Sequence, residues 1–259
     1  SSTSRGLGDV YKRQVQHGHF TFGETARASY EKIIEHTNEV AKYLGMETPT
    51  QLGERCMTKG VDLLPTLRGL IAEVNSERDN AMPVFDLRNG EYTQEFLSRC
   101  DVEGLSTRGM ASPDHVLRTK GRPLLLTSAD LASRDTIKAK LEAFADEYRA
   151  YFTRQSQNAN ESKKQLLPDP KHAWIEGLGV VGIGQNAKTA SIAADLAEQN
   201  LRVRAIGEDK GGFYPLNEKD MFDCEYWSLE QAKLGKGATL PFEGQIVTVS
   251  YTHLRAHET

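Results

Sequence analysis

The sequence predicts a mixed α/β fold, because short strand-like segments alternate with amphipathic helix-like segments. Two stretches, residues 17–44 and 173–197, each run from a strand through a glycine turn into a helix. In the first stretch, apolar residues recur at intervals of three and four, which places one apolar face of the helix against a core. These positions are Ala26, Tyr30, Ile33, Ile34, Val40, Ala41 and Leu44.

The remaining elements are predicted from the same signals. They are a helix over 61–74 with Pro65 near its start, a strand over 81–87, a short helix through Phe96 and Leu97, and a long helix lined by Ile137, Leu141, Phe144 and Tyr148. Residues 155–170 are expected to be an exposed linker or loop. Residues 201–206 are predicted as a strand, or as a helix that continues into one.

Composition is that of an ordered protein large enough to bury a core. The chain has 259 residues, 38% hydrophobic and 26% charged, and a net charge of -4. This net negative charge does not suggest binding to nucleic acid or to an anionic membrane, both of which favour basic proteins. No apolar run reaches the length of a membrane span. Cys56, Cys100 and Cys224 are isolated, so we expect no disulfide framework and a cytoplasmic location.

Gly177, Gly179 and Gly182 have the Gly-x-Gly-x-x-Gly spacing of a dinucleotide-binding turn. Their surroundings argue against that function, because Val180 to Ile183 look like a strand that continues through the glycines. Glu198 also lies within a predicted helix rather than at the end of a second strand. We therefore prefer to interpret the glycines as part of a strand, turn and helix.

We interpret residues 173–197 as a repeat of the first stretch, with chance similarity as the alternative. A shift of 161 residues (179 − 18) aligns Gly18 with Gly179, Gly23 with Gly184, Ala26 with Ala187 and Arg27 with Lys188. Leu178 then stands where the first copy has His17. The second copy is expected to keep the scaffold without the histidine.

Three segments carry a resemblance to a known family. The run from His17 to Glu31 resembles the His-Gly segment that supplies the last zinc-ligand histidine of class II aldolases of the fuculose and rhamnulose phosphate type. Residues 106–126 (Pro-Asp-His, Arg-Thr-Lys and Pro-Leu) and 211–235 (Phe-Asp-x-Glu-Tyr-Trp-Ser-Leu-Glu) are similar to bifunctional rhamnulose-1-phosphate aldolase and short-chain dehydrogenase proteins of the class II aldolase/adducin family. The resemblance covers residues 15–248.

The resemblance implies a partial class II aldolase-like α/β sandwich. Residues 15–154 would be the C-terminal part of that domain, 171–237 a second α/β subdomain and connector, and 238–248 the first strand of a truncated Rossmann-type dehydrogenase domain. Residues 1–14 and 249–259 resemble translated sequencing-adapter sequence, so we expect them to be artefacts at the two ends of a fragment. A genuine terminal tail is the alternative.

His17 is the candidate metal ligand, because a His-Gly at a strand edge can bring an imidazole nitrogen to a metal. The alternative is a strand histidine bonded to backbone. His19 points to the same side of an extended chain and is a second candidate, although the family pattern has one histidine here. The resemblance implies zinc, with further ligands and the general base upstream of Val15. One imidazole cannot hold zinc, so the fragment alone is expected to be inactive.

A mostly cationic set lies between residues 108 and 122, and it suits a phosphorylated or carboxylated small molecule. Its members are Arg108, Asp114, His115, Arg118, Lys120 and Arg122. Within it we take His115, Arg118 and Lys120 as candidate substrate-binding residues. The alternative is a solvated loop with a helix start at Ser112 and Pro113.

For the intact parent, the resemblance implies cleavage of a deoxyketose 1-phosphate to dihydroxyacetone phosphate and lactaldehyde. The lactaldehyde would then be oxidised with NAD by the dehydrogenase domain. The expected partners are a sugar phosphate and further copies of the chain, with neither nucleic acid nor membrane. Two other functions remain open. One is a non-catalytic, adducin-like interaction module, and the other is a nucleotide-binding oxidoreductase built on Gly177 to Gly184.

Overall fold

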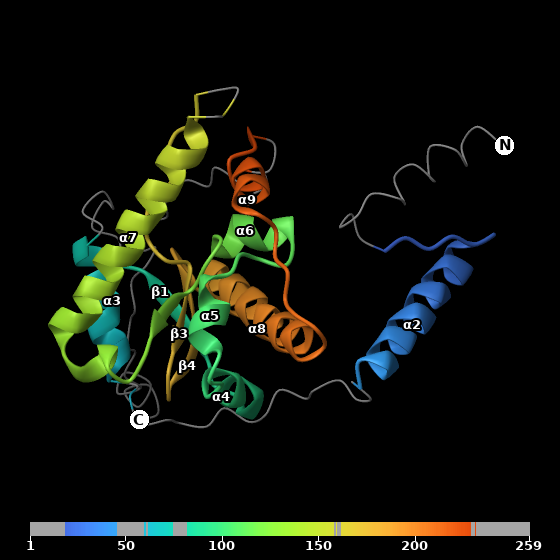
Figure 1. Ribbon diagram of the computed structural model, residues 1–259, viewed down its shortest axis with the longest axis horizontal. Helices are drawn as coiled ribbons and strands as arrows, with labels where there is room; N and C mark the ends of the chain where they lie inside the picture. Colours follow the sequence, from blue (N-terminus) through green and yellow to red (C-terminus); the bar gives the residue numbers. More distant parts are fainter. Residues whose placement is uncertain are drawn as a thin grey trace, which may run out of the picture. The chain divides into compact units, whose positions relative to one another are not determined.

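The computed structural model describes residues 19–45, 60, 62–74, 82–157, 159, 162–228 and 231. They belong to two compact units, residues 1–51 and 52–259, which we treat separately. Figure 1 shows helix α2 (Ala26–Tyr43) of the first unit and the sheet and helices of the second. His17 and the segments 1–14, 238–248 and 249–259 lie outside the described residues, so the predictions made for them are not addressed by the structure.

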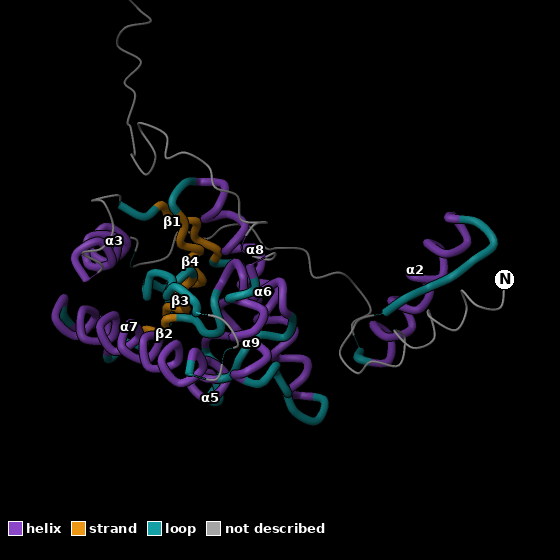
Figure 2. The backbone as a smooth tube through the Cα atoms, turned by 90° about the horizontal axis from the view of Figure 1, so that it is seen from above, coloured by secondary structure: helices purple, strands orange, loops and turns teal. Residues whose placement is uncertain are grey.

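The second unit is built on a four-stranded sheet in the order β1-β4-β3-β2. The strands are β1 (Val84–Arg88), β2 (Leu124–Leu126), β3 (His172–Ile175) and β4 (Gly179–Gly184). β4 pairs antiparallel with both β1 and β3, and β2 pairs parallel with β3. The α/β prediction is confirmed, since helices cover both faces of this sheet. In Figure 2, α3 (Leu63–Val74) and α7 (Arg134–Ser156) lie on one side of the strands and α8 (Ala187–Asp209) on the other.

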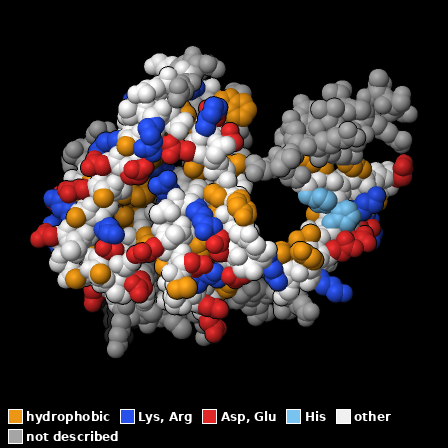
Figure 3. Space-filling model, viewed as in Figure 1, with side chains coloured by type: hydrophobic (Ala, Val, Ile, Leu, Met, Phe, Trp, Pro, Cys, Tyr) orange, Lys and Arg blue, Asp and Glu red, His pale blue; other side chains and the backbone are white. Residues whose placement is uncertain are grey.

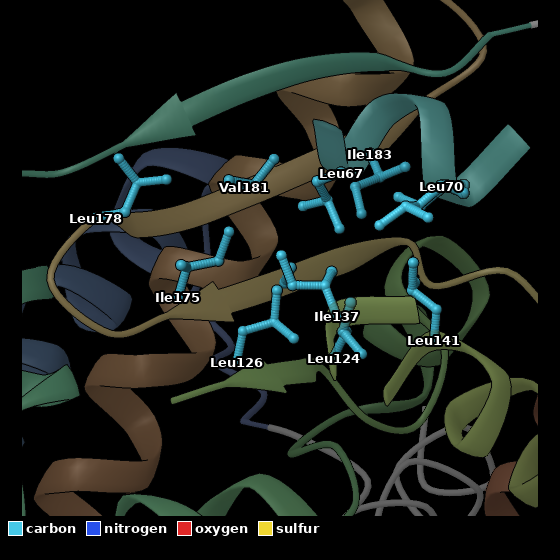
Figure 4. Packing of buried hydrophobic residues seen from close by; sticks show 12 residues of the cluster. Leu67, Leu70, Leu124, Leu126, Ile137, Leu141, Ile175, Leu178, Val181 and Ile183 are labelled. Atoms are coloured by element: carbon cyan, nitrogen blue, oxygen red, sulfur yellow. The ribbon is translucent and has the colours of Figure 1, made fainter. Parts of the chain in front are cut away.

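The two core clusters follow from strand alternation, because successive side chains of a strand point to opposite faces. Ala173 and Ile175 of β3 belong to the core cluster that also contains Leu67 of α3 and Leu141 of α7. Figure 4 shows Ile175 in this cluster near Leu126 and Val181. Trp174, between Ala173 and Ile175 in sequence, packs on the opposite face with residues of α8 and of α4 (Glu91–Leu97). Both faces of the sheet are therefore buried.

Several predicted elements lie where the sequence places them. The helix expected over 61–74 is α3, with Pro65 at its third position, and the strand expected over 81–87 is β1. The short helix through Phe96 is α4, and the long amphipathic helix is α7. The other elements are α5 (Val102–Thr107), α6 (Pro113–Thr119), a 3-10 turn at Asp130–Ala132 and α9 (Glu218–Glu225).

The glycine-rich segment forms a hairpin rather than a nucleotide-binding turn. Gly177 and Gly179 adopt φ values of 73° and 138° at the turn between the antiparallel strands β3 and β4. Gly182 lies within β4, and a Cβ there would come within 2.2 Å of the Ala190 carbonyl oxygen of α8. The glycines let the turn form and let a helix pack directly on the strand. The oxidoreductase alternative built on this segment has no dinucleotide-binding turn here.

The proposed repeat holds for the turn and the helix. A Cβ at Gly23 would contact Ala28 and Ser29, and one at Gly184 would contact Thr189 and Ala190, five and six residues further on in both copies. The strand half is not repeated, because residues 19–23 are loop rather than the predicted strand. A strand needs a neighbour to bond to, and the described part of the first unit contains no second extended partner.

The prediction that α2 packs against a core is wrong for the described residues. Its apolar stripe was expected to face a core, yet no residue of α2 is buried within the described structure. Tyr30 is 64% exposed and Val40 56% exposed. The periodicity thus predicts the helix and its apolar face correctly, but the described first unit supplies no surface for that face to cover.

In the second unit, one further prediction is wrong and another is narrowed. Residues 201–206 lie inside α8, because Leu201, Arg204 and Ala205 are buried at helical spacing against neighbouring elements. Residues 162–170 are loop, and the last of them, 168–170, are buried. Strands β1 and β2 precede this loop and β3 and β4 follow it in the same sheet, so of the two alternatives, linker or loop, the described residues form a loop within one unit. No described helix has the length and apolarity needed to cross a membrane.

Candidate functional site

The histidine expected to bind metal cannot be placed, because His17 lies outside the described residues. His19 is described, and its Nε2 lies 2.9 Å from Nδ1 of His36 on α2, with the two rings edge to face. This is a hydrogen-bonded pair of imidazoles. Among the described residues no three His, Cys, Asp or Glu side chains gather as a metal site would require. The residues in view therefore do not fit a zinc centre by themselves.

The structure divides the cationic set of residues 108–122. His115 lies on α6 with Nδ1 2.6 Å from the Asn200 side-chain amide of α8, and Arg108 forms an ion pair of 2.5 Å with Glu208. Arg118 is half-buried near the end of α6. Lys120 and Arg122 face the other way and line a cavity beside α7. The helix start at Ser112 and Pro113 is confirmed, although the Ser112 side chain makes no cap bond.

That cavity has a volume of about 270 Å³. It lies between α5, the segment 120–125, α7 and α9, and its walls are mainly apolar and aromatic. Figure 3 shows apolar side chains in a hollow between α7 and α5, with Lys and Arg side chains near it. A concave, mainly apolar pocket with a few charged groups is the usual form of a small-molecule site.

Lys120 stands at the edge of this cavity in a strained backbone conformation. Its φ is 61°, and no other non-glycine residue in the described ranges has a positive φ. The conformation ends α6 and turns the side chain inward, where Nζ donates to the Leu167 carbonyl oxygen and lies 3.4 Å from the centre of the Tyr148 ring. Such strain costs about 1–3 kcal/mol and persists where the surroundings hold the residue in place.

A buried acid lies behind Lys120. Glu225 of α9 accepts hydrogen bonds from the hydroxyls of Tyr148 at 2.7 Å and Tyr151 at 3.2 Å, both on α7. The Tyr226 hydroxyl lies 2.7 Å from that of Tyr148. Burial raises the pKa of Glu225, and the charge of Lys120 acts in the opposite direction. Burial also raises the pKa of Tyr226 to about 12, so this tyrosine stays protonated at neutral pH.

Comparison with known proteins identifies the domain. The family model described as class II aldolase, second domain, matches residues 58–234. The chain belongs to this family. The matched range begins after α2 and runs through both halves of the sheet, so the aldolase second domain includes the strands on both sides of residues 155–170.

One curated relative is similar along most of the chain. It is the uncharacterized oxidoreductase YuxG of Bacillus subtilis (strain 168), 27% identical over 235 residues, which are 85% of this chain and 33% of that protein. The chain thus spans about a third of the length of this relative. No solved structure matches significantly.

The aldolase second domain also contains two buried ionisable residues that sequence reasoning missed. Arg204 of α8 donates to the carbonyl oxygens of Leu105, Arg108 and Gly109, and so closes the C-terminal end of α5. Burial lowers its pKa to about 9, with a smaller effect from the charge of Arg108. The guanidinium thus donates to carbonyl oxygens in the last turn of α5 and just after it, where backbone donors are few. The available signal in the sequence was the spacing of the apolar residues Leu201 and Ala205, four positions apart as on one face of a helix. The prediction of a strand over 201–206 overlooked it.

His172 of β3 is the second of these residues and is fully buried. Its Nδ1 lies 3.1 Å from the Thr119 carbonyl oxygen at the end of α6, and its Nε2 has no partner among the described residues. Burial lowers the pKa of His172 to about 3, and the charge of Arg204 adds to this. The neutral ring links β3 to the segment that carries Lys120.

Proposed function

We propose that the chain is part of a class II aldolase of the rhamnulose-1-phosphate type, whose intact parent is fused to an NAD-dependent short-chain dehydrogenase. The family match over residues 58–234 carries the lyase part of this proposal. The dehydrogenase part is supported by YuxG, which is named an oxidoreductase and extends far beyond the matched region. Residues 211–235, with their resemblance to the segment that joins the two activities, fit the same arrangement.

In this proposal the parent would cleave a deoxyketose 1-phosphate and would hold zinc through His17 and histidines upstream of Val15. Zinc would act as a Lewis acid toward the enediolate. The chain's own contribution in the described residues is the second domain. Of the candidate substrate residues His115, Arg118 and Lys120, only Lys120 borders the cavity. A homo-oligomeric parent and a cytoplasmic location remain predictions.

A non-catalytic interaction module, as in adducin-like proteins, is the second candidate. The exposed apolar stripe of α2 favours it, because a face that carries Tyr30, Ile33 and Val40 outward is suited to binding another protein surface. An aldolase parent would cover the same face with its own upstream residues. The exposed apolar face of α2 is compatible with both candidate functions. Measurement of the metal content distinguishes them.

The test uses the longer reading frame that contains this chain, expressed as the wild type, His17→Ala and His19→Ala. We expect one zinc per chain in the wild type and release of dihydroxyacetone phosphate from rhamnulose 1-phosphate. His17→Ala should lose zinc and lower kcat/KM by at least about 100-fold, because loss of a group that only supports a metal ligand already costs roughly 10–100-fold. His19→Ala should change both by less than about two-fold. A wild type with neither zinc nor lyase activity would favour the interaction module.

A further inference from the structure

The cavity beside Lys120 combines apolar walls with cations at its edge. Phe144, Tyr148 and Tyr151 of α7 face Leu124 of β2 and Met221 of α9 across it. A ring or short hydrocarbon chain placed there would leave water for a largely apolar surface, at a gain of about 25 cal/mol per Å² buried. The volume of about 270 Å³ limits the occupant to a small molecule.

The charges around the cavity leave a positive balance. Its lining includes the cations Lys120, Arg122 and Lys140 and the acids Glu147 and Glu218. Arg154, which is not part of the lining, pairs with Glu147 and with Glu218, each at 3.1 Å. Arg154 brings one positive charge that the two acids share, and Asp130 pairs with Lys140, so among these groups four cations stand against three acids and the balance is positive.

Arg122 is the cation best suited to hold a ligand. Its one ion-pair contact in the described structure is with Glu147 at 4.0 Å, which is beyond hydrogen-bond distance, and its side chain is 40% exposed. Its donors are thus available for a bidentate bond to a carboxylate. Lys140, by contrast, pairs with Asp130 at 3.3 Å.

We propose that this cavity binds a small organic acid, a single carboxylate on an apolar or aromatic body, with the carboxylate on Arg122 and the body against Phe144 and Tyr148. A sugar phosphate fits these walls poorly, because its hydroxyls would be buried without hydrogen-bond partners. Binding at this cavity does not depend on zinc or on the lyase reaction. The experiments below therefore test it independently of the function proposed above.

Phenylacetate is the probe, titrated into the full chain by isothermal calorimetry, with phenylacetamide as the uncharged analogue. Arg122→Gln should weaken phenylacetate binding by about ten-fold, the usual effect of losing a charge-assisted hydrogen bond. Arg149→Gln is the matched control, since Arg149 lies on α7 outside the cavity and pairs with Asp146. It should change binding by less than about two-fold. Phenylacetamide should bind at least ten-fold more weakly than phenylacetate to the wild type.

A second pair of variants tests the cavity itself. Ala143 lines the cavity and Ala139 does not, although both are exposed on α7. Ala143→Trp should fill the opening and abolish phenylacetate binding, whereas Ala139→Trp should leave it unchanged, with equal melting temperatures as evidence of folding. Equal binding to both tryptophan variants, equal binding of phenylacetamide and phenylacetate, or competition by inorganic phosphate as effective as that by phenylacetate would overturn the proposal.

Discussion

Helices α2 and α8 begin in the same way and end in different surroundings. Each follows a glycine two residues before its N-cap, Gly23 before Thr25 and Gly184 before Asn186. In each, the cap side chain accepts the backbone N–H three residues on, at 3.1 Å in α2 and 3.0 Å in α8. Yet α2 buries no residue and α8 buries eight. A helix start is therefore local information, whereas burial depends on what lies opposite.

The different surroundings have a simple cause. α8 lies on β4 and β1, where Gly182 and Gly184 remove the side chains that would hold it away from the strands. α2 follows a loop that pairs with no described strand, so its stripe has no sheet to cover. Three predictions test how far this contrast extends, from the largest expected effect to the smallest.

The first prediction compares equivalent truncations in the two helices. Leu201→Ala in α8 removes a fully buried side chain and should lower the free energy of unfolding of the second unit by about 2–5 kcal/mol. Ile33→Ala in α2, where the side chain is 40% exposed, should change stability by less than about 0.5 kcal/mol. Urea unfolding is followed by tryptophan fluorescence for Leu201→Ala, because Trp174 is fully buried in the second unit, and by far-UV circular dichroism for Ile33→Ala, because α2 belongs to the first unit. A cost above 1.5 kcal/mol for Ile33→Ala would mean that α2 is covered in solution.

The second prediction concerns pH and His172. Its pKa in the folded chain, about 3, lies below the ordinary value of 6.5, so the native state favours the neutral ring. The resulting stabilisation is complete above about pH 6.5 and is lost progressively as the pH falls toward 3, by at most about 1.4 kcal/mol per pH unit. His172→Gln should flatten this part of the stability profile. His36→Gln, on the half-exposed residue of α2, is the control and should leave the slope of the second unit unchanged.

The third prediction concerns the two N-caps and has the smallest effect. Asn186→Ala should destabilise the second unit by about 1 kcal/mol, because the Thr189 N–H loses its acceptor. Thr25→Ala should have a similar local cost, but with no buried residue in α2 it should appear as fraying. Amide hydrogen exchange at Ala28 and Thr189 measures both. An unchanged exchange rate at Ala28 together with faster exchange at Thr189 would show that the two starts are not equivalent.

Much of the fold could be predicted because its signals are local. The apolar spacing of Ile137, Leu141 and Tyr148 gave α7, and Val180 to Ile183 were correctly interpreted as strand in spite of the flanking glycines. The failures were at 19–23, where a strand lacked a partner, and at 201–206, where a strand, or a helix that continues into one, was predicted and the residues lie inside α8. In both segments the surroundings, rather than local propensity, decided the conformation.

The candidate site was only partly visible in the sequence. Lys120 and Arg122 stood out as members of a cationic run, but that run also suggested His115 and Arg118, which do not line the cavity. Nothing in the sequence indicated that Glu225 is buried beside the cavity, because its hydrogen-bond partners Tyr148 and Tyr151 lie more than 70 residues away along the chain. Periodicity shows which face of a helix is apolar, and it does not show which distant helix will face it.

By itself, the sequence determined the α/β class, the helix starts and the resemblance to class II aldolases, since each depends on neighbouring residues or on a contiguous motif. Only the tertiary structure decided that the strands on either side of residues 155–170 form one sheet, and that Lys120 lies against Tyr148 beside an apolar cavity. The physical reason is that strand pairing and burial join segments far apart in the chain. Their stability comes from the partner that each segment meets, and no single segment encodes that partner.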